Sequence, residues 1–416
     1  MLFIRECKKV LFSLTFWLYF IAVLAMFFTQ FYPDCRYAVT APVPGQENYG
    51  MTAKEIPETL MPAAAESLVS EYLSGSFKAY PLGFYKEVRL NAKKKEKMAE
   101  IITEISGISK EQLDSFTDFQ EGGYFMTEDG SFSYMEPTLP EIHIPDSLTY
   151  EHFRELMREA DELIGGGSKY ADESIVNNFS LVPKTYEDAL EEYEEFVNDD
   201  KFTIAYARLY CDYLGIVIAI LPVFAAVSIS GLDKKSRMEQ LFYARKVSSA
   251  RLVFTRYAAL IMTMSLPIMI TAGIAQSKVI GLYSGADLDQ FAIFQYAAIW
   301  LLPSLMTASA VGMLVTEGCS GLLAIFIQGA WWFASTFASA AGLTGSFGKL
   351  TLVLRHNSLS ERGLFHYETF IFNRAFFAGI SILAVALTAL IYAKKRRGRC
   401  HVFQIRIPDS WHKSEA

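Results

Sequence analysis

Residues that could do covalent or metal chemistry are few in this sequence. His152 and Glu155 form an HxxE pair, as two metal ligands on one helix face would, but no third ligand accompanies them. The stretch "GLTGSFGKL" at 342–350 resembles a phosphate-binding loop, yet Leu343 and Leu350 stand where that motif needs Gly and Ser or Thr. No HExxH or GxSxG motif is present. The sequence therefore predicts no catalytic residue, no directly bound cofactor and no metal site.

Four polar side chains in apolar surroundings are candidates for a substrate path. Arg208 and Asp212 are four residues apart, so they can pair on one helix face near the membrane interface. They are either a gate or, as we favour, a structural ion pair. Gln295 and Gln328 lie inside long apolar runs. They either line a path or, in the interpretation we favour, make hydrogen bonds between helices.

The five cysteines have no CxxC or zinc-site spacing. Cys35 and Cys211 are both expected near the outer membrane face, one just after the first apolar run and one just inside the second. An oxidising exterior would allow a disulfide between them, but the sequence alone does not bring the two sulfur atoms together.

Long apolar runs are the elements that must position these side chains. The 416 residues are 52% hydrophobic and 14% aromatic, and ionisable residues bracket the apolar runs. Each run has about 19 or more residues, which at about 1.5 Å per residue spans a hydrocarbon core of about 30 Å. Pro222, Pro267 and Pro303 are expected to kink three of them. We predict an α-helical polytopic membrane protein with six transmembrane helices, near 10–31, 209–230, 253–275, 291–315, 319–341 and 372–393.

Charge is distributed unevenly along the chain. Between Pro33 and Lys201 there are 34 acidic and 15 basic residues, whereas the remainder has an excess of basic residues. Basic residues precede the first span, fill the connection 231–256 and follow the last span from Lys394. Because short cytosolic flanks are rich in Lys and Arg, both termini are predicted to be cytosolic and the acidic region extracellular. The predicted segments are 1–31 (N-tail and helix one), 32–205 (extracellular domain), 206–393 (helices two to six) and 394–416 (basic cytosolic tail).

The extracellular region is predicted to be a folded α+β domain inserted between helices one and two. Helical spacing covers 91–109 and 148–168, and the acidic stretch 185–196 is also expected to be helical. Residues 119–137 are expected to form a hairpin of aromatic-rich strands. Helices and a hairpin with few Gly or Pro linkers indicate a folded domain rather than a disordered tether.

The connection "GLDKKSRMEQLFYARKVSSARLVFTR" at 231–256 is the most strongly patterned cytosolic segment. It carries seven Lys or Arg against two acids, and a helix break is expected at 247–249. Met238, Leu241 and Phe242 are spaced as one short apolar stripe of a helix. Such a stripe either inserts into a groove on a partner protein or lies on anionic lipid headgroups, and the pattern alone does not decide between them.

Five stretches carry a family resemblance: "LTYEHFRELMREADELIGGGSKYADE" (148–173), "TYEDALEEYEEF" (185–196), "AYARLYCDYLGIVIAILPVF" (205–224), "LDKKSRMEQLFYARKVSSARLVFTRYAAL" (232–260) and "LVLRHNSLSERGLFHYETFIFNRAFF" (352–377). With the order of one span, a large external domain and five further spans, the chain resembles ABC-2-type transporter permeases, particularly those of Gram-positive bacteria. In that family the loop between the second and third spans carries a coupling helix that docks on a separate ATPase. The resemblance implies this contact for Asp233, Lys235, Arg237, Met238, Leu241, Phe242, Arg245 and Lys246.

The resemblance implies the membrane-spanning permease subunit of an ABC transporter, an exporter, with ATP bound and hydrolysed on a cytosolic ATPase subunit. Six spans are few for a transport path, so a second permease chain, identical or related, is expected beside this one in the lipid bilayer; nucleic acid is not expected as a partner. The Gly/Ala/Ser-rich span at 319–341 is either the seam between the chains or internal packing. The alternative is a non-transporting membrane receptor or scaffold that acts through its extracellular domain. A membrane-embedded enzyme would need paired acids or a His cluster in the spans, and the sequence offers neither.

Overall fold

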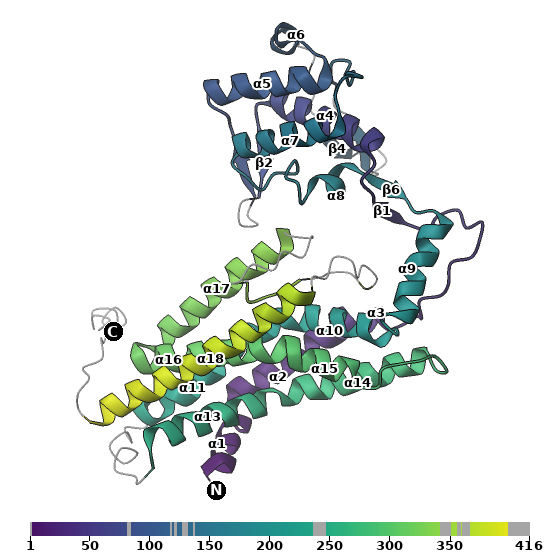
Figure 1. The fold of residues 1–416 in the computed structure, drawn as a ribbon. Helices are drawn as coiled ribbons and strands as arrows, with labels where there is room; N and C mark the ends of the chain where they lie inside the picture. The colour runs from purple at the N-terminus through teal and green to yellow at the C-terminus, as the bar shows by residue number, and fades with distance from the viewer. Residues whose placement is uncertain are drawn as a thin grey trace. The chain divides into compact units, whose positions relative to one another are not determined.

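Helices make up most of the computed structural model, and the chain divides into two units with separate hydrophobic cores (Figure 1). The structure describes residues 2–80, 85–116, 119, 123–126, 132–135, 138–235, 247–341, 351–355, 359 and 367–397. The first unit, here the membrane unit, comprises Met1–Ala41, Glu192–Ser339 and Gly345–Ala416. The second, here the acidic unit, comprises Pro42–Glu191 with Ala340–Thr344.

The membrane unit begins with a short amphipathic helix followed by a long apolar one. After α1, Leu2–Leu11, the side chain of Ser13 caps the next helix by accepting a hydrogen bond from the Phe16 N–H. From there α2 (Leu14–Met26), a π-helical turn (Phe27–Phe31) and α3 (Tyr32–Asp34) follow without a gap. Together they give an apolar helix of 21 residues, Leu14–Asp34, which is long enough to cross a hydrocarbon core of about 30 Å.

A bent pair of helices comes next in this unit. Helix α10, Thr203–Ile218, and helix α11, Pro222–Lys235, meet at an angle of 41°. Pro222 lacks an N–H, so it cannot donate to the carbonyls of the preceding turn. The Gln328 side chain of α17 (Gly321–Ala341) donates to the Ala219 carbonyl at the break, at 2.7 Å. The expected kink at Pro222 is therefore confirmed.

Three further helical regions of the membrane unit are long. Only Ser265 separates α13 from α14, and α15 continues through a π-helical turn into α16. Pro267 and Pro303 lie in the first turns of α14 and α16, where one helical element gives way to the next. Both prolines lie within helical regions that continue as single candidate spans, so the kinks expected at Pro267 and Pro303 stay a prediction. The bounds are α13 Ser249–Met264, α14 Leu266–Leu282, α15 Ala292–Tyr296, the π-helical turn Ala297–Leu301, α16 Leu302–Gly318 and α18 Tyr367–Arg396.

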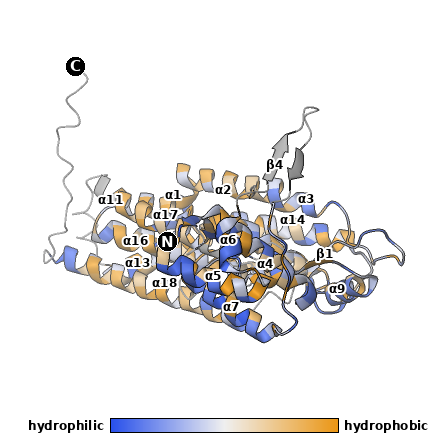
Figure 2. Ribbon diagram, turned by 90° about the horizontal axis from the view of Figure 1, so that it is seen from above, coloured by the Kyte–Doolittle hydropathy of each residue, from blue (hydrophilic) through white to orange (hydrophobic). Residues whose placement is uncertain are grey.

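By length and composition, four of the described helices could cross a membrane, and the bent α10–α11 pair would make a fifth. The four are Leu14–Asp34, Ser249–Leu282, Ala292–Gly318 and Tyr367–Arg396. Helix α17 is also apolar, but its described apolar part, Gly321–Phe337, is shorter. Figure 2 shows hydrophobic residues along much of these helices. The chain is therefore a helical membrane protein, and the count of six spans stays a prediction.

In its described residues, the acidic unit combines helices with three two-stranded antiparallel sheets. The strand pairs are β1–β6 (Met51–Ala53 with Leu181–Pro183), β2–β3 (Phe77–Ala79 with Lys86–Val88) and β4–β5 (Gly123–Met126 with Phe132–Met135). The helices are α4 Pro57–Ser74, α5 Ala92–Ser106, α6 Lys110–Ser115, α7 Tyr150–Ile164 and α8 Ile175–Phe179. Helix α9, Tyr186–Asn198, begins in this unit and continues into the membrane unit from Glu192. The predicted hairpin at 119–137 and the predicted helices at 91–109, 148–168 and 185–196 are confirmed.

Helix ends in the acidic unit follow from the local sequence. The side chains of Asn91 and Thr149 accept N–H bonds in the first turns of α5 and α7. Gly107 and Gly165 end the same two helices with φ values of 68° and 118°, in the left-handed region that glycine adopts without strain. Between these ends the apolar faces of α4, α5 and α7 pack against one another and form the core of the unit.

Candidate functional site

Asp212 is a fully buried carboxylate in α10. Its partner is Arg355, whose Nε lies 3.2 Å and 3.1 Å from the two carboxylate oxygens. The predicted pairing of Asp212 with Arg208 is therefore wrong. Helical spacing put Arg208 within reach, but packing brings a residue 143 positions away against the carboxylate. Removing one partner of such a buried pair leaves an uncompensated charge, so both are needed together.

Arg208 forms a separate ion pair with Asp200. Its Nη1 and Nη2 atoms donate to the two Asp200 oxygens at 2.7 Å and 2.5 Å, and neither side chain is more than 3% exposed. The pair closes the turn into α10, where Lys201 and Phe202 have φ values of 45° and 58°. Such conformations cost about 1–3 kcal/mol each and persist only where surrounding contacts impose them. Arg208 is therefore in a buried ion pair, with a partner other than the predicted one, and its role as a gate or as a structural residue stays a prediction.

Arg374, near the start of α18, is another buried charge of the membrane unit. Its side chain is 2% exposed and donates to five oxygen atoms. The acceptors are Trp300 O at 3.2 Å, Ser304 Oγ at 2.9 Å, Thr351 O at 3.4 Å, Leu352 O at 3.2 Å and Asn373 Oδ1 at 2.5 Å. All five acceptors are neutral, so the described residues supply hydrogen bonds but no counter-charge. An ionisable residue held this way inside a membrane protein is a candidate for function.

Arg374 holds a buried segment without helical structure, residues 351–355. Leu352 in this segment is fully buried and shares an apolar cluster with Ala219 at the α10–α11 bend. Non-helical backbone at membrane depth needs partners for its polar groups. The Leu352 N–H donates to Ser335 Oγ at 3.2 Å, and the Leu352 carbonyl accepts from Arg374. The segment is therefore held both by hydrogen bonds to its backbone and by apolar contacts of its side chains.

Together these groups form what is here called the buried cluster: Asp212, Ser304, Asn373, Arg374 and the segment 351–355. Arg374 and Lys395 are 21 residues apart on α18, a separation of about 32 Å along the helix axis. The cluster therefore lies about one hydrocarbon thickness from the basic end of α18. With two arginines and one carboxylate, its chemistry suits binding of a polar or anionic group, or holding the segment in place. The sequence did not indicate Arg355 and Arg374 as site residues, because the partner of Arg355 and all but one of the partners of Arg374 are far away in the sequence.

The two glutamines proposed for a substrate path have different surroundings. Gln328 is fully buried and donates to the Ala219 carbonyl. Trp332 of the same helix makes a similar bond, since its Nε1 donates to the Ile216 carbonyl at 2.8 Å. The interpretation of Gln328 as a hydrogen bond between helices is confirmed. Gln295 lies on an exposed face of α15. The structure therefore does not bring the two glutamines together.

Cys35 and Cys211 are both buried in the membrane unit, and both are free thiols. The disulfide that the sequence allowed is not formed. Both side chains belong to the apolar core between α2, α3 and α10, so packing accounts for their burial.

The predicted partner contact falls mostly outside the described part of the chain. Arg237, Met238, Leu241, Phe242, Arg245 and Lys246 lie outside the described residues, as do the side chains of Asp233 and Lys235 in the last turn of α11. Beyond the gap, Ser248 caps α13 by accepting from the Arg251 N–H at 3.2 Å, so a helix begins where the sequence placed the end of the break, and the helix expected before it lies outside the described residues. Arg396 Nη1 donates to the Val247 carbonyl at 2.6 Å. The loop therefore begins at α11 and ends at a residue held by α18.

A further buried ion pair joins α1 to α13. Glu6 Oε2 lies 3.6 Å from Arg256 Nε, and both side chains are almost fully buried. Lys9 adds a bond of 2.7 Å to the other Glu6 oxygen. The sequence does not indicate this pair, because 249 residues separate Glu6 from Arg256. The signal that could have found it is a single acid in an otherwise basic N-tail.

Known proteins give no match. No family model matches the chain, no curated protein matches it and no solved structure matches it. A functional proposal therefore rests on the residues of this chain: the basic loop after α11, the bent α10–α11 pair and the buried cluster. The resemblance to ABC-2-type permeases stays a prediction.

His152 in the acidic unit contacts two carboxylates. Its Nε2 lies 2.7 Å from Glu104 Oε1, and its Nδ1 lies 3.4 Å from Glu155 Oε2. Within the described residues no three or more His, Cys, Asp or Glu side chains gather as metal ligands would. Hydrogen bonding to Glu104, and then to Glu155, raises the pKa of His152 above its ordinary value of 6.5. The arrangement is therefore a pair of surface ion pairs when His152 is protonated.

We expect these ion pairs to make the stability of the acidic unit depend on pH. Folding raises the pKa of His152, so the ion pairs stabilise the folded state fully at a pH below the unfolded-state pKa of about 6.5. This stabilisation is lost as the pH rises through the pKa that His152 has in the folded state. His152→Gln should therefore flatten the fall of the melting temperature above that pH, measured by calorimetry on the full chain. His143→Gln, at an exposed histidine, is the matched control and should keep the wild-type pH profile. An unchanged slope in His152→Gln would show that the contacts contribute nothing.

Proposed function

We propose that this chain is the membrane-spanning permease subunit of an ATP-binding cassette transporter, an exporter driven by a separate cytosolic ATPase subunit. One observation carries the proposal: the bent α10–α11 pair joins the basic loop to Ala219, which shares an apolar cluster with Leu352 of the anchored segment. A displacement of the loop thus has a direct mechanical route to the buried cluster. The apolar stripe of the loop and the family resemblance point to an ATPase as the partner that moves it.

The proposed topology has six spans, in which the α10–α11 pair and α17 each count as one. Both termini and the loop after α11 are cytosolic, and the acidic unit is extracellular. Basic residues support this orientation, because α18 ends with Lys394, Lys395 and Arg396 and the last turn of α1 carries Lys8 and Lys9. A second permease chain, identical or related, pairs with this one to complete the transport path.

In the proposed cycle, ATP binding on the partner pushes the loop, and α11 moves as a rigid lever. The 14 residues of α11 extend about 21 Å, from the loop to the break before Pro222. Gln328 and Trp332 hold the far end of this lever at the bend. A change in the bend angle displaces Ala219 against the segment 351–355. Arg374 and the Asp212–Arg355 pair fix that segment in the closed state, and its release opens the path at that end of the unit.

Acidic substitutions in the apolar stripe are expected to abolish association with the ATPase. Met238→Asp and Leu241→Asp each place a charge where an apolar anchor would enter a groove, at a cost of about 2–4 kcal/mol, or about 30- to 1,000-fold in affinity. The measurement is co-expression of the chain with a candidate ATPase subunit, sought first in the neighbouring reading frame, followed by quantification of the ATPase that co-purifies. Gln240→Asp adds the same charge outside the stripe and should keep the association.

Full ATPase association with both stripe variants, at normal membrane levels of the chain, would overturn the proposal. Normal cellular function after the loop is scrambled would point to the alternative, a non-transporting membrane receptor or scaffold that acts through the acidic unit. That alternative draws its support from the acidic unit's own helical core. The two hypotheses therefore make opposite predictions for the same loop.

A further inference from the structure

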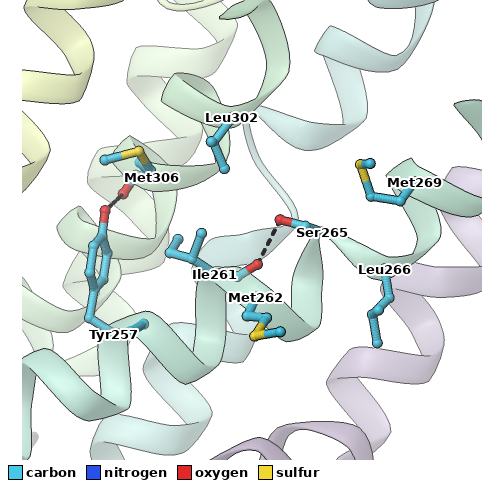
Figure 3. Close-up of a pocket in the computed structure, with 9 residues that line it drawn as sticks. Tyr257, Ile261, Met262, Ser265, Leu266, Met269, Leu302 and Met306 are labelled. Carbon is cyan, nitrogen blue, oxygen red and sulfur yellow. Dashed lines mark hydrogen bonds between the residues drawn. The ribbon is translucent and has the colours of Figure 1, made fainter. Parts of the chain in front are cut away.

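An apolar pocket lies where two helical regions of the membrane unit are interrupted. Helix α13 gives way to α14 at Ser265, and α16 begins at Leu302 after a π-helical turn. Between them is a pocket of about 540 Å³, and Figure 3 shows Leu302 and Met306 on one helix across from Ile261 and Ser265 on the other. This volume is within the range of small-molecule sites, about 300–1,000 Å³.

The pocket lies near the middle of a candidate membrane span. The continuous region Ser249–Leu282 has 34 residues, so it is about 51 Å long. Ser265 follows Ser249 by 16 positions and precedes Leu282 by 17. When such a helix crosses a membrane, its midpoint is inside a hydrocarbon core of about 30 Å. The occupant of the pocket is therefore taken from the acyl region of the bilayer.

The two hydroxyl groups of the pocket already have partners. Tyr257 donates its hydroxyl proton to the Met306 carbonyl at 3.1 Å, and Ser265 donates to the Ile261 carbonyl at 2.8 Å (Figure 3). The remaining lining side chains are Ala, Ile, Leu and Met, and none carries a charge. A polar or charged ligand would thus lose its hydration without gaining new hydrogen bonds. The chemistry of the lining matches an uncharged hydrocarbon.

The pocket opens on the outside of the membrane unit. Met262, Leu266 and Met269 line it and are 63%, 42% and 46% exposed. Methionine side chains are flexible and polarisable, so they can adapt to a chain of variable conformation. An α-helix with its side chains is about 10–12 Å across, so a pocket of about 540 Å³ takes only isolated side chains of a neighbouring helix. An unbranched chain, by contrast, can enter it lengthwise.

We propose that this pocket binds one acyl chain of a membrane phospholipid at the α13–α14 junction. The chain fills the space where the helices are interrupted and packs between α13–α14 and α16. The pocket is therefore a lipid-binding site, and it is independent of the loop that is proposed to contact the ATPase.

Photolabelling of the full chain in phosphatidylcholine bilayers tests the proposal. The probe is a phosphatidylcholine with a diazirine midway along one acyl chain, and labelled peptides are mapped by mass spectrometry. Labelling around Met262 should exceed labelling at Ile270 and Ile274, which are also exposed on α14 but do not line the pocket. Ala258→Trp fills the pocket from an exposed lining position and should reduce the labelling to that of the Ile270 face.

Two further variants keep the experiment decisive. Ile274→Trp adds the same bulk outside the pocket and should leave the pocket labelling unchanged. Leu266→Trp is a second filling variant, to be used if Ala258→Trp does not fold. Equal labelling of the pocket and of the Ile270 face would overturn the proposal. So would photocrosslinking of position 262 to a second copy of the chain, which would make a helix the occupant. The ATPase is absent throughout, so failure here leaves the permease proposal standing.

Discussion

Replacing Arg374 with methionine is expected to release the segment 351–355 from the membrane unit. The change removes the donor to five oxygens, and each polar atom left buried without a partner costs about 1–3 kcal/mol. Removing a buried charge from the protein interior offsets part of that loss, so we expect a net destabilisation of about 2–4 kcal/mol. Transport should fall with it, because the segment would no longer be held in its closed position.

Thiol labelling of Val353→Cys measures the release directly. Val353 is buried in the native segment, so a water-soluble maleimide should label this cysteine slowly when Arg374 is present. A drop of about 2 kcal/mol in the free energy of local opening would raise the labelling rate about 30-fold. The purified full chain in detergent serves for the measurement.

The control variants separate charge from geometry. Arg374→Lys keeps the charge but lacks the planar fork that spans several acceptors, so it should give an intermediate labelling rate. Arg36→Met removes an exposed arginine of the same unit and should leave the rate unchanged. An unchanged rate in Arg374→Met would mean that other contacts hold the segment, and the buried cluster would lose its proposed role.

The parts of the fold that the sequence predicted correctly depend on short-range patterns. Apolar runs long enough to cross a membrane recur as helices, because their length and composition are properties of one continuous stretch. The hairpin at 119–137 and the end of α5 at Gly107 follow from turn and cap residues next to one another in the chain. The kink at Pro222 needs only the missing N–H of proline.

The contacts that the sequence could not supply are the long-range ones. Asp212 had a basic residue at helical spacing, yet its partner is Arg355, which packing brings from a distant segment. Glu6 and Arg256 likewise meet only because α1 packs on α13. Spacing along one helix limits which side chains can meet, but the approach of other elements decides which of them do. The sequence therefore predicted that the candidate site would contain polar side chains within spans. It did not predict which of these side chains pair with one another.

The span at 319–341 is rich in small residues, and such residues allow helices to approach closely. The structure has one close approach there, because a Cβ atom at Gly321 would lie 2.5 Å from Val227 Cγ1 of α11. A second close contact, which the sequence did not indicate, is between α11 and α16 at Gly312. A Cβ atom at Gly312 would lie 2.6 Å from the Ala226 Cβ and 3.2 Å from the Val223 carbonyl oxygen. Only glycine allows the two backbones to come this close. Because α11 is the proposed lever, this contact is one place where it bears on the rest of the unit.

Gly312→Ala adds a single methyl group, but we expect it to destabilise the membrane unit and to impair transport. Overpacking of a tight contact costs about 1–3 kcal/mol in stability. Gly312→Leu should cost more, because its larger side chain would also meet the backbone of α11 at Val223. Thermal unfolding of the purified chain and a transport assay on the same variants measure both effects. Gly329→Ala is the matched control, since nothing lies within 4 Å of a Cβ atom there, and it should retain wild-type stability or gain slightly.

A compensating substitution makes this prediction specific to the α11–α16 contact. Ala226→Gly removes the atom that a Cβ at position 312 would meet at 2.6 Å, so the double variant should recover stability relative to Gly312→Ala alone. Recovery of transport along with stability would tie the close approach of α11 and α16 to the working of the lever. If Ala226→Gly gives no recovery in either measurement, the cost of Gly312→Ala arises elsewhere, and α11 does not bear on α16 as proposed.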